Sequence, residues 1–185
     1  HEASETLPEA FAVINPKRDS AYPFQGICGT VVAYKLAQAI LEEGKKSGLI
    51  TLKDGWEKWW LDLVGIATVA DMVPLVDENR TLARYGLSVL RKSKRPGLQH
   101  LLRKAGSSQQ HLTEDDIGFT IGPRINAASR MDNPEDAFHM LRTRDEVEAG
   151  AYVAHLEKLN NERKGVVASM TKEAKKRMSA FENVP

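Results

Sequence analysis

The stretch LDLVGIATVADMVPL, residues 61–75, decides how this part of the chain folds. Its first ten residues are mostly apolar, which predicts a helix that is buried over much of its surface. One carboxylate, Asp71, follows this run, and Pro74 comes three residues later. Burial of an unpaired carboxylate costs on the order of several kcal/mol. Asp71 is therefore predicted to pair with Arg80 or Arg84, to cap the next segment, or to bind Mg²⁺ or Mn²⁺.

Around this stretch, apolar residues recur at helical spacing through most of the chain. The FAVIN run at 11–15 ends at Pro16 and predicts a short buried strand. Thr113 is predicted to cap a segment that then enters a loop at Gly122 and Pro123. The helical pattern predicts further helices over 30–48, 56–71, 78–93, 96–108 and 133–143.

Residues 145–178 contain no proline and are rich in helix formers. If continuous, a helix over this range is about 50 Å long. A helix of this length is typical of a connector between domains. One strand, many helices and a long terminal helix predict an α/β class, with the helix-rich rear part of a parallel-sheet domain followed by a connecting helix.

The composition excludes several classes of protein. Of 185 residues, 42% are hydrophobic and 28% are charged, which argues against a disordered chain. No apolar run approaches the roughly 20 residues that span a bilayer, and the opening HEASETLPEA lacks a basic and then apolar leader. Cys28 is the one cysteine, so no internal disulfide forms. We expect a cytoplasmic protein.

The net charge is only +1, but basic residues are unevenly distributed. Eight Lys and Arg residues and no Asp or Glu lie between Arg80 and Lys104, with RKSKRPG at 91–97. A block of this kind attracts a phosphate backbone. A solvated helix end and loop would have the same composition, so both interpretations stay open.

The segment GPRINAASR, residues 122–130, combines Arg124 and Arg130 with Asn126 and several small residues. Arginine forks bind phosphate oxygens in a bidentate manner, and small residues let a backbone approach closely. The alternative is a tight helix-packing corner with surface arginines.

Other candidate residues give weaker signals. The spacing of Trp56, Trp59 and Trp60 places them on one face of a helix, which favours core or interface anchors over base stacking. The five histidines show no zinc-finger spacing, and Cys28 has no partner cysteine. The sequence also contains no Walker loop and no dinucleotide-binding fingerprint.

Taken in order, these segments resemble the DHH phosphoesterase superfamily, and most closely its RecJ-type single-strand-specific exonucleases. The first segment is similar to the sequence after the Asp-His-His signature of the family, with His1 as its last histidine. The last is similar to the start of the helix that leads to the DHH-associated domain. The segments that carry the resemblance are HEASETLPEAFAVINPKR, CGTVVAYKLAQAI, LDLVGIATVADMVPLVDENRTLARYGL, IGPRINAASRM and HLEKLNNERK.

The resemblance implies a role for each candidate residue. Asp71 would ligate one ion of a Mn²⁺ or Mg²⁺ pair, and His1 would face the substrate phosphate. Arg130, with Asn126 beside it and Arg124 in the same segment, would lie near the phosphate backbone. The implied chemistry is two-metal hydrolysis, in which one ion activates water and both stabilise the charge that develops on phosphorus.

The resemblance also implies that the chain is a fragment. Residues 1–143 would be a partial DHH domain, 144–180 the connecting helix, and 181–185 the start of the DHH-associated domain. The Asp-x-Asp ligands and the first residues of the signature are not in this sequence, so we expect no activity from the chain alone. Val31 and Ser129 stand where the family usually has glycine.

The function implied is that of a metal-dependent exonuclease that degrades single-stranded DNA from its 5′ end in recombination and repair. One alternative is a DHH phosphodiesterase that acts on short oligonucleotides or cyclic dinucleotides. A second is a non-catalytic protein of the same fold that binds DNA or replication partners. Retention of Asp71 argues against the second alternative.

Overall fold

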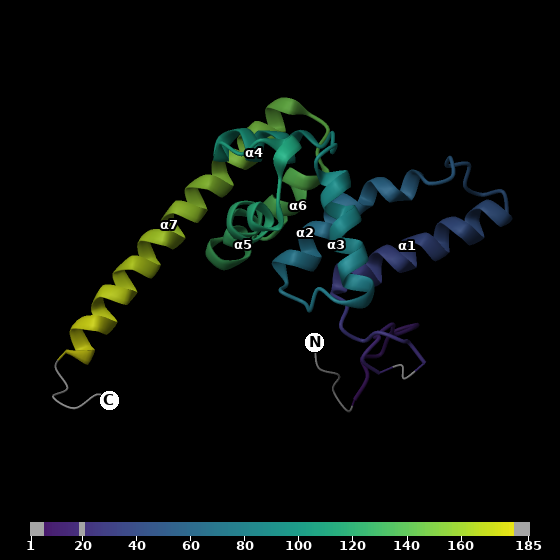
Figure 1. The fold of residues 1–185 in the computed structure, drawn as a ribbon, viewed down its shortest axis with the longest axis horizontal. Helices are drawn as coiled ribbons and strands as arrows, with labels where there is room; N and C mark the ends of the chain where they lie inside the picture. The colour runs from purple at the N-terminus through teal and green to yellow at the C-terminus, as the bar shows by residue number, and fades with distance from the viewer. Residues whose placement is uncertain (1–5, 19–20, 180–185) are drawn as a thin grey trace. The chain divides into compact units, whose positions relative to one another are not determined.

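The computed structural model describes residues 6–18 and 21–179, and the regular elements within these ranges are all helical (Figure 1). None of the described helices combines the length and the apolar character needed to cross a membrane. The elements in chain order are α1 (Gly29–Lys46), the 3₁₀ helix η1 (Trp56–Trp60), α2 (Leu61–Ala70), α3 (Asp77–Leu90), α4 (Pro96–Ala105), the 3₁₀ helix η2 (Gln109–His111), the π-helix η3 (Asp116–Ile121), α5 (Gly122–Met131), α6 (Glu135–Arg142) and α7 (Glu146–Met178).

The chain forms two compact units. The first consists of His1–Ser93 and Ser108–Gly118, and the second of Lys94–Ser107 and Phe119–Pro185. In the first unit, α1 and α2 bury one core, into which the residues before α1 also reach. The buried members of this core are Cys28, Val31, Tyr34 and Val64.

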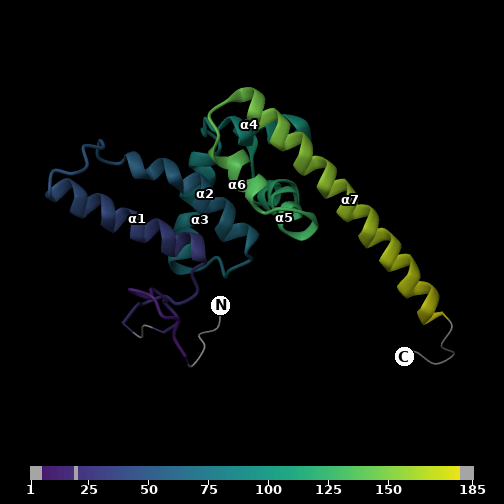
Figure 2. The ribbon, with the colours of Figure 1, turned by 180° about the vertical axis from the view of Figure 1, so that it is seen from behind.

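Helices α2 and α3 pack against each other at two glycines, and Figure 2 shows the two helices side by side. A Cβ atom placed on Gly86 would lie 2.5 Å from the Cα atom of Gly65 and 2.7 Å from the carbonyl oxygen of Leu61. Real Cβ atoms do not approach a backbone this closely. The absence of a side chain at both positions therefore sets the distance between the two helices.

In the second unit, α7 packs on α4, α5 and α6. Helix α4 meets α6 at Gly97, where an added Cβ atom would collide with the Met140 carbonyl group. Ile121 at the end of η3 is completely buried in this unit, and the other core residues come from all four helices. They are Leu98, Leu101, Leu102, Ala127, Ala128, Ala137, Met140, Ala149, Val153, Leu156 and Leu159.

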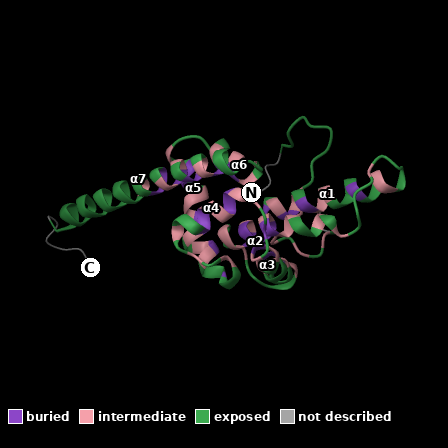
Figure 3. Cartoon of the chain, turned by 90° about the horizontal axis from the view of Figure 1, so that it is seen from above, coloured by how far each residue is buried: buried purple, intermediate pink, exposed green. Residues whose placement is uncertain are grey.

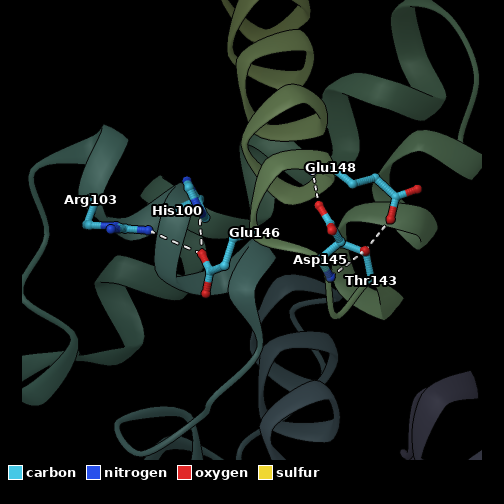
Figure 4. A network of polar contacts seen from close by, with 6 residues as sticks. All are labelled: His100, Arg103, Thr143, Asp145, Glu146 and Glu148. Carbon is cyan, nitrogen blue, oxygen red and sulfur yellow. Dashed lines mark hydrogen bonds and ion pairs between the residues drawn. The ribbon is translucent and has the colours of Figure 1, made fainter.

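The first turn of α7 is fixed by polar side chains (Figure 4). The Asp145 carboxylate accepts a hydrogen bond from the Glu148 backbone N–H at 2.8 Å, which is a regular N-cap. The Thr143 hydroxyl donates to the Glu148 carboxylate and accepts from the Asp145 N–H. The Glu146 carboxylate lies 2.8 Å from Nε2 of His100 on α4. These contacts account for the start of the helix at the position that the sequence predicts.

The long helix predicted over 145–178 is confirmed, since α7 runs from Glu146 to Met178. Residues 164–179 are all exposed, and Figure 3 shows this half of α7 without buried residues. The first half packs with α4, α5 and α6. The division of the chain into 1–143 and 144–180 stays a prediction, and 181–185 lie outside the described residues.

The strand predicted over 11–15 is not formed. Phe11 is fully exposed, and Val13 and Ile14 are 43% and 59% exposed. A strand needs a partner for its backbone hydrogen bonds, and the described residues offer no other strand. The α/β prediction is therefore confirmed only in its helical part. The apolar run indicates side chains that favour burial, but it does not identify the element that would pack against them.

The loop predicted at Gly122 and Pro123 is also wrong, because both residues open α5. Proline is compatible with the first turn of a helix, where its missing N–H has no partner to lose. Thr113 lies directly before the helical run that begins at residue 114, as predicted, but the capping acceptor is the carboxylate of Asp116. Thr113 donates its backbone N–H and its hydroxyl to the Asp116 carboxylate, at 2.9 and 3.0 Å.

The tryptophans do not share one face. They lie in η1, a 3₁₀ helix, in which successive residues are rotated by about 120° rather than 100°. Trp60 packs on the core of the first unit, whereas Trp56 and Trp59 are 40% and 47% exposed. Spacing alone could not reveal this, because it presumes the α-helical period.

We expect Gly86→Ala to lower the free energy of unfolding by about 1–3 kcal/mol, because the added methyl group meets backbone atoms that cannot move aside. Gly29→Ala is the matched control, since a Cβ atom there has no neighbour within 4 Å. Urea denaturation followed by circular dichroism measures both variants. Equal stability of the two would contradict the close approach of α2 and α3.

Candidate functional site

Asp71 lies at the C-terminal end of α2. Its backbone N–H donates to the Ala67 carbonyl at 2.9 Å, and its side chain is exposed. The expectation that this carboxylate is buried is therefore wrong. Helix α2 ends at Ala70, and the chain then turns through Met72, whose φ is +53°. The turn takes Asp71 out of the apolar surface of the helix.

Two of the alternatives for Asp71 find no support. Within the described residues, no ion pair joins its carboxylate to Arg80 or Arg84. The carboxylate also does not cap α3, whose N-cap is Val76. A carboxylate at the C-terminal end of a helix is disfavoured by the helix dipole, by about 0.3–1 kcal/mol. An exposed oxygen donor in this unfavourable place fits a hard divalent cation, which would remove the repulsion.

The buried carboxylate of this segment is Asp62, which the sequence reasoning missed. Asp62 is 3% exposed and lies in the first turn of α2, where the helix dipole favours a negative charge. Its oxygens accept hydrogen bonds from the Ser93 hydroxyl and from the Leu63 N–H, both at 2.8 Å. Its position at a helix N-terminus was the available signal. Asp62 serves the packing of the first unit.

Asn79, on α3, contacts the turn that follows Asp71. Its side-chain nitrogen donates to the Pro74 carbonyl at 3.0 Å and to the Gly26 carbonyl at 2.8 Å. Asn79 is completely buried. The turn after Asp71 and the segment before α1 are thus joined through one side chain.

A second polar group joins the same parts of the first unit. The Glu78 carboxylate accepts a hydrogen bond from the Tyr22 hydroxyl at 2.7 Å and pairs with the Lys35 ammonium at 2.5 Å. Partial burial alone would raise the pKa of Glu78, but the hydrogen bonds from Lys35 and Tyr22 and the charge of Lys35 hold that pKa below its usual range. Burial raises the pKa of Tyr22.

Helix α5 carries the residues predicted to bind phosphate, and it separates them into two groups. Asn126 and Arg130 are exposed and lie four residues apart, so they share one face. Arg124 lies about 120–160° around the helix from them at 3.6 residues per turn. Ala127 and Ala128 are completely buried, so these two small residues pack in the core rather than line a loop.

Arg124 binds a protein carboxylate. Its Nε atom donates to Glu157 on α7 at 2.6 Å, and Nη2 donates to the other oxygen at 3.3 Å. Its Nη1 atom donates to the Thr120 carbonyl at 2.9 Å. The two side chains are only 13% and 18% exposed. The structure therefore gives Arg124 a role in holding α5 on α7, and its predicted role in substrate binding stays a prediction.

The basic block from Arg80 to Lys104 divides in a similar way. Arg80, Arg84 and Lys92 are exposed in the first unit. Arg91, in contrast, donates from two nitrogens to the Leu112 carbonyl, at 2.9 and 2.6 Å. In the second unit, Arg95 donates to the Leu141 carbonyl at 3.1 Å. Two arginines of the block thus bind backbone carbonyls of the chain itself and stabilise the fold.

Two further points concern histidines. His1 lies outside the described residues. His155 on α7 lies 3.4 Å from an oxygen of Asp132 and 3.3 Å from an oxygen of Asp136. The three side chains come together from α7, the end of α5 and α6, so no sequence spacing could have found them.

Known proteins match the chain along most of its length. It is 39% identical over 175 residues to the single-stranded-DNA-specific exonuclease RecJ of Bacillus subtilis, which covers 94% of this chain and 21% of that protein. It is 38% identical over 181 residues to RecJ of Escherichia coli, which covers 94% of this chain and 31% of that protein. The predicted resemblance to RecJ-type exonucleases is confirmed. No protein-family model matches the chain.

The comparison of structures points to the same proteins as the comparison of sequences. A crystal structure of RecJ from Thermus thermophilus in complex with Mn²⁺ matches the RecJ-like chain with a TM-score of 0.77 and 30% identity. The match covers 94% of this chain and 25% of that one. The chain thus spans about a fifth to a third of the length of the curated relatives described above.

We expect Glu78→Gln to lower stability most near pH 7 and progressively less as the solution becomes acidic. The folded pKa of Glu78 lies below its ordinary value of 4.5, so its stabilising effect is present above that value and is lost as the pH falls through the folded pKa. Urea denaturation at several pH values between 3 and 7, on a roughly unit spacing, tests this.

The control for this series is Glu42→Gln, which removes a carboxylate from an exposed pair with Lys46. Solvent screens such a pair, so the control is expected to change stability less than Glu78→Gln at neutral pH. A difference between wild type and Glu78→Gln that did not vary with pH would refute the role of the Glu78 charge.

Proposed function

We propose that this chain forms part of a Mn²⁺- or Mg²⁺-dependent exonuclease that hydrolyses phosphodiester bonds of single-stranded DNA from the 5′ end. Its work would be in recombination and repair, in the cytoplasm. The observation that carries the proposal is the similarity to RecJ exonucleases over 94% of the chain, in sequence and in fold. The exposed carboxylate of Asp71, at the end of an apolar helix, supports it.

In this proposal, Asp71 holds one divalent cation together with ligands from outside the described residues, and His1 would face the substrate phosphate. The metal supplies Lewis acidity and an activated water molecule. The contribution of Asp71 is a negatively charged oxygen at a fixed place. Asn would keep the shape of the side chain but remove the charge.

Helix α5 would bind the DNA backbone through its exposed face. Arg130 offers a guanidinium group that has no ion-pair partner in the part of the chain that the structure describes, and Asn126 offers an amide one turn earlier. Arg124, fixed by Glu157 and Thr120, keeps the helix in its orientation on α7. The arginines therefore have different roles, one toward the phosphate and one toward the fold.

The first test follows the degradation of 5′-phosphorylated single-stranded DNA in Mn²⁺ by the intact protein that carries this chain. We expect stepwise shortening from the 5′ end in the wild type and a loss of activity of at least about 10²-fold in Asp71→Asn, because the neutral amide would hold less well the cation that stabilises the charge on phosphorus. Binding without degradation in the wild type would indicate a non-catalytic DNA-binding protein. Preference for dinucleotides over long strands would indicate a phosphodiesterase of short substrates.

The second test separates the two arginines. We expect Arg130→Ala to weaken binding of single-stranded DNA and to reduce the slope of log K against log salt by about 0.7, the value for one phosphate contact. Fluorescence anisotropy at several salt concentrations measures this. Arg124→Lys is expected to lower the melting temperature and to leave the slope unchanged. The same slope in wild type and Arg130→Ala would contradict the phosphate contact.

A further inference from the structure

The turn that follows Asp71 lies between two residues with unusual backbone conformations, one at its start and one at the start of α3. Met72 has a φ of +53° and Asp77 a φ of +44°, and in the described chain they are the non-glycine residues with positive φ. Such conformations raise the free energy of the chain and persist only where the surroundings hold them in place. The segment between them must therefore be anchored from outside.

Asn79 provides this anchor. The backbone groups of residues 73–75 take part in one hydrogen bond in the described structure. In this bond the Asn79 side chain donates to the Pro74 carbonyl at 3.0 Å. The same nitrogen donates to the Gly26 carbonyl at 2.8 Å, just before the buried Cys28. Val73 adds an apolar contact with the core of the first unit. The middle of the turn is thus fixed to the core at two points.

The orientation of the Asn79 amide follows from its partners. Both neighbours are carbonyl oxygens, so the nitrogen must face them, because a flipped amide would place oxygen against oxygen. The remaining oxygen, Oδ1, is buried and has no donor in the described residues. Such an unsatisfied acceptor is unfavourable. An apolar side chain would avoid this cost, so the two donated bonds are what asparagine contributes here.

We propose that Asn79 is a positioning residue, which holds the 72–76 turn and thereby fixes the Asp71 carboxylate for binding of a divalent cation. The inference rests on the proposed function for the identity of the cation. The anchoring of the turn by Asn79 is independent of the proposed function. Asn79 touches neither metal nor substrate. Its effect passes through the backbone of the turn to Asp71.

The experiment compares three variants of the intact protein. Asn79→Ala removes both donated bonds, and Asn79→Asp keeps the size of the side chain but presents an oxygen to each carbonyl. The control, Leu90→Ala, truncates a completely buried residue at the other end of α3 and so perturbs the same helix away from the turn. Three quantities are measured for each: the Mn²⁺ concentration for half-maximal cleavage, Mn²⁺ binding by electron paramagnetic resonance, and hydrogen exchange of the Met72 and Arg80 amides, which donate to the Val69 and Val76 carbonyls at the two ends of the turn.

We expect both Asn79 variants to need about 10-fold more Mn²⁺ for half-maximal cleavage and for binding, the effect typical of residues that orient a metal ligand. Saturating Mn²⁺ should restore most of kcat, and exchange of the Met72 and Arg80 amides should increase. Leu90→Ala should change global stability without changing the Mn²⁺ midpoint. An unchanged midpoint in folded Asn79 variants would overturn the proposal, as would an equal shift in Leu90→Ala.

The exchange measurement separates this inference from the proposed function. If the wild type neither binds Mn²⁺ nor cleaves DNA, the proposed function fails, and so does the role of Asn79 toward a metal. Faster exchange of the Met72 and Arg80 amides in the Asn79 variants, relative to Leu90→Ala, would still support the anchoring of the turn. Unchanged exchange there would overturn the anchoring as well.

Discussion

The close contact between Gly65 and Gly86 is the constraint on which the first unit depends. Because neither residue has a side chain, the backbones of α2 and α3 approach each other directly. This contact determines how far apart the end of α2 and the start of α3 lie, and residues 71–76 must connect them. The position of Asp71 is therefore a consequence of helix packing. The conformation of the turn is restricted by the distance that it must span between the two helices.

Much of the helical fold could be predicted from the sequence, because each helix has local signals. The apolar period of α3, the proline at the start of α4 and the capping residue of α7 all act within a few neighbouring residues. The errors lie where structure depends on partners. The 11–15 run was predicted as a strand because of its composition, but a strand exists only when another strand pairs with it. The loop at Gly122 was predicted from turn residues that also fit the first turn of a helix.

The candidate site was predictable in part for the same reason. Asp71 was singled out by a local feature, a carboxylate at the end of an apolar run, but its exposure depends on the turn at Met72. The separation of Arg124 from Arg130 follows from α5 being a helix, which the sequence reasoning had treated as a loop. The partner of Arg124, Glu157, lies 33 residues further along the chain, so only the fold reveals the pair.

The departures from local preference gather around Asp71. A carboxylate follows the C-terminal end of α2, Met72 in the adjacent turn and Asp77 at the start of α3 have left-handed backbone conformations, and a buried amide oxygen has no donor in the described residues. Any one of these would be unremarkable in a surface loop. Together they form a connected set, since the Asn79 amide that leaves its oxygen unsatisfied is the one that holds the turn. A sequence selected only for stability would relieve them with glycine at position 72 and an apolar residue at 79. The proposed role of Asp71 as a metal ligand would account for their presence together.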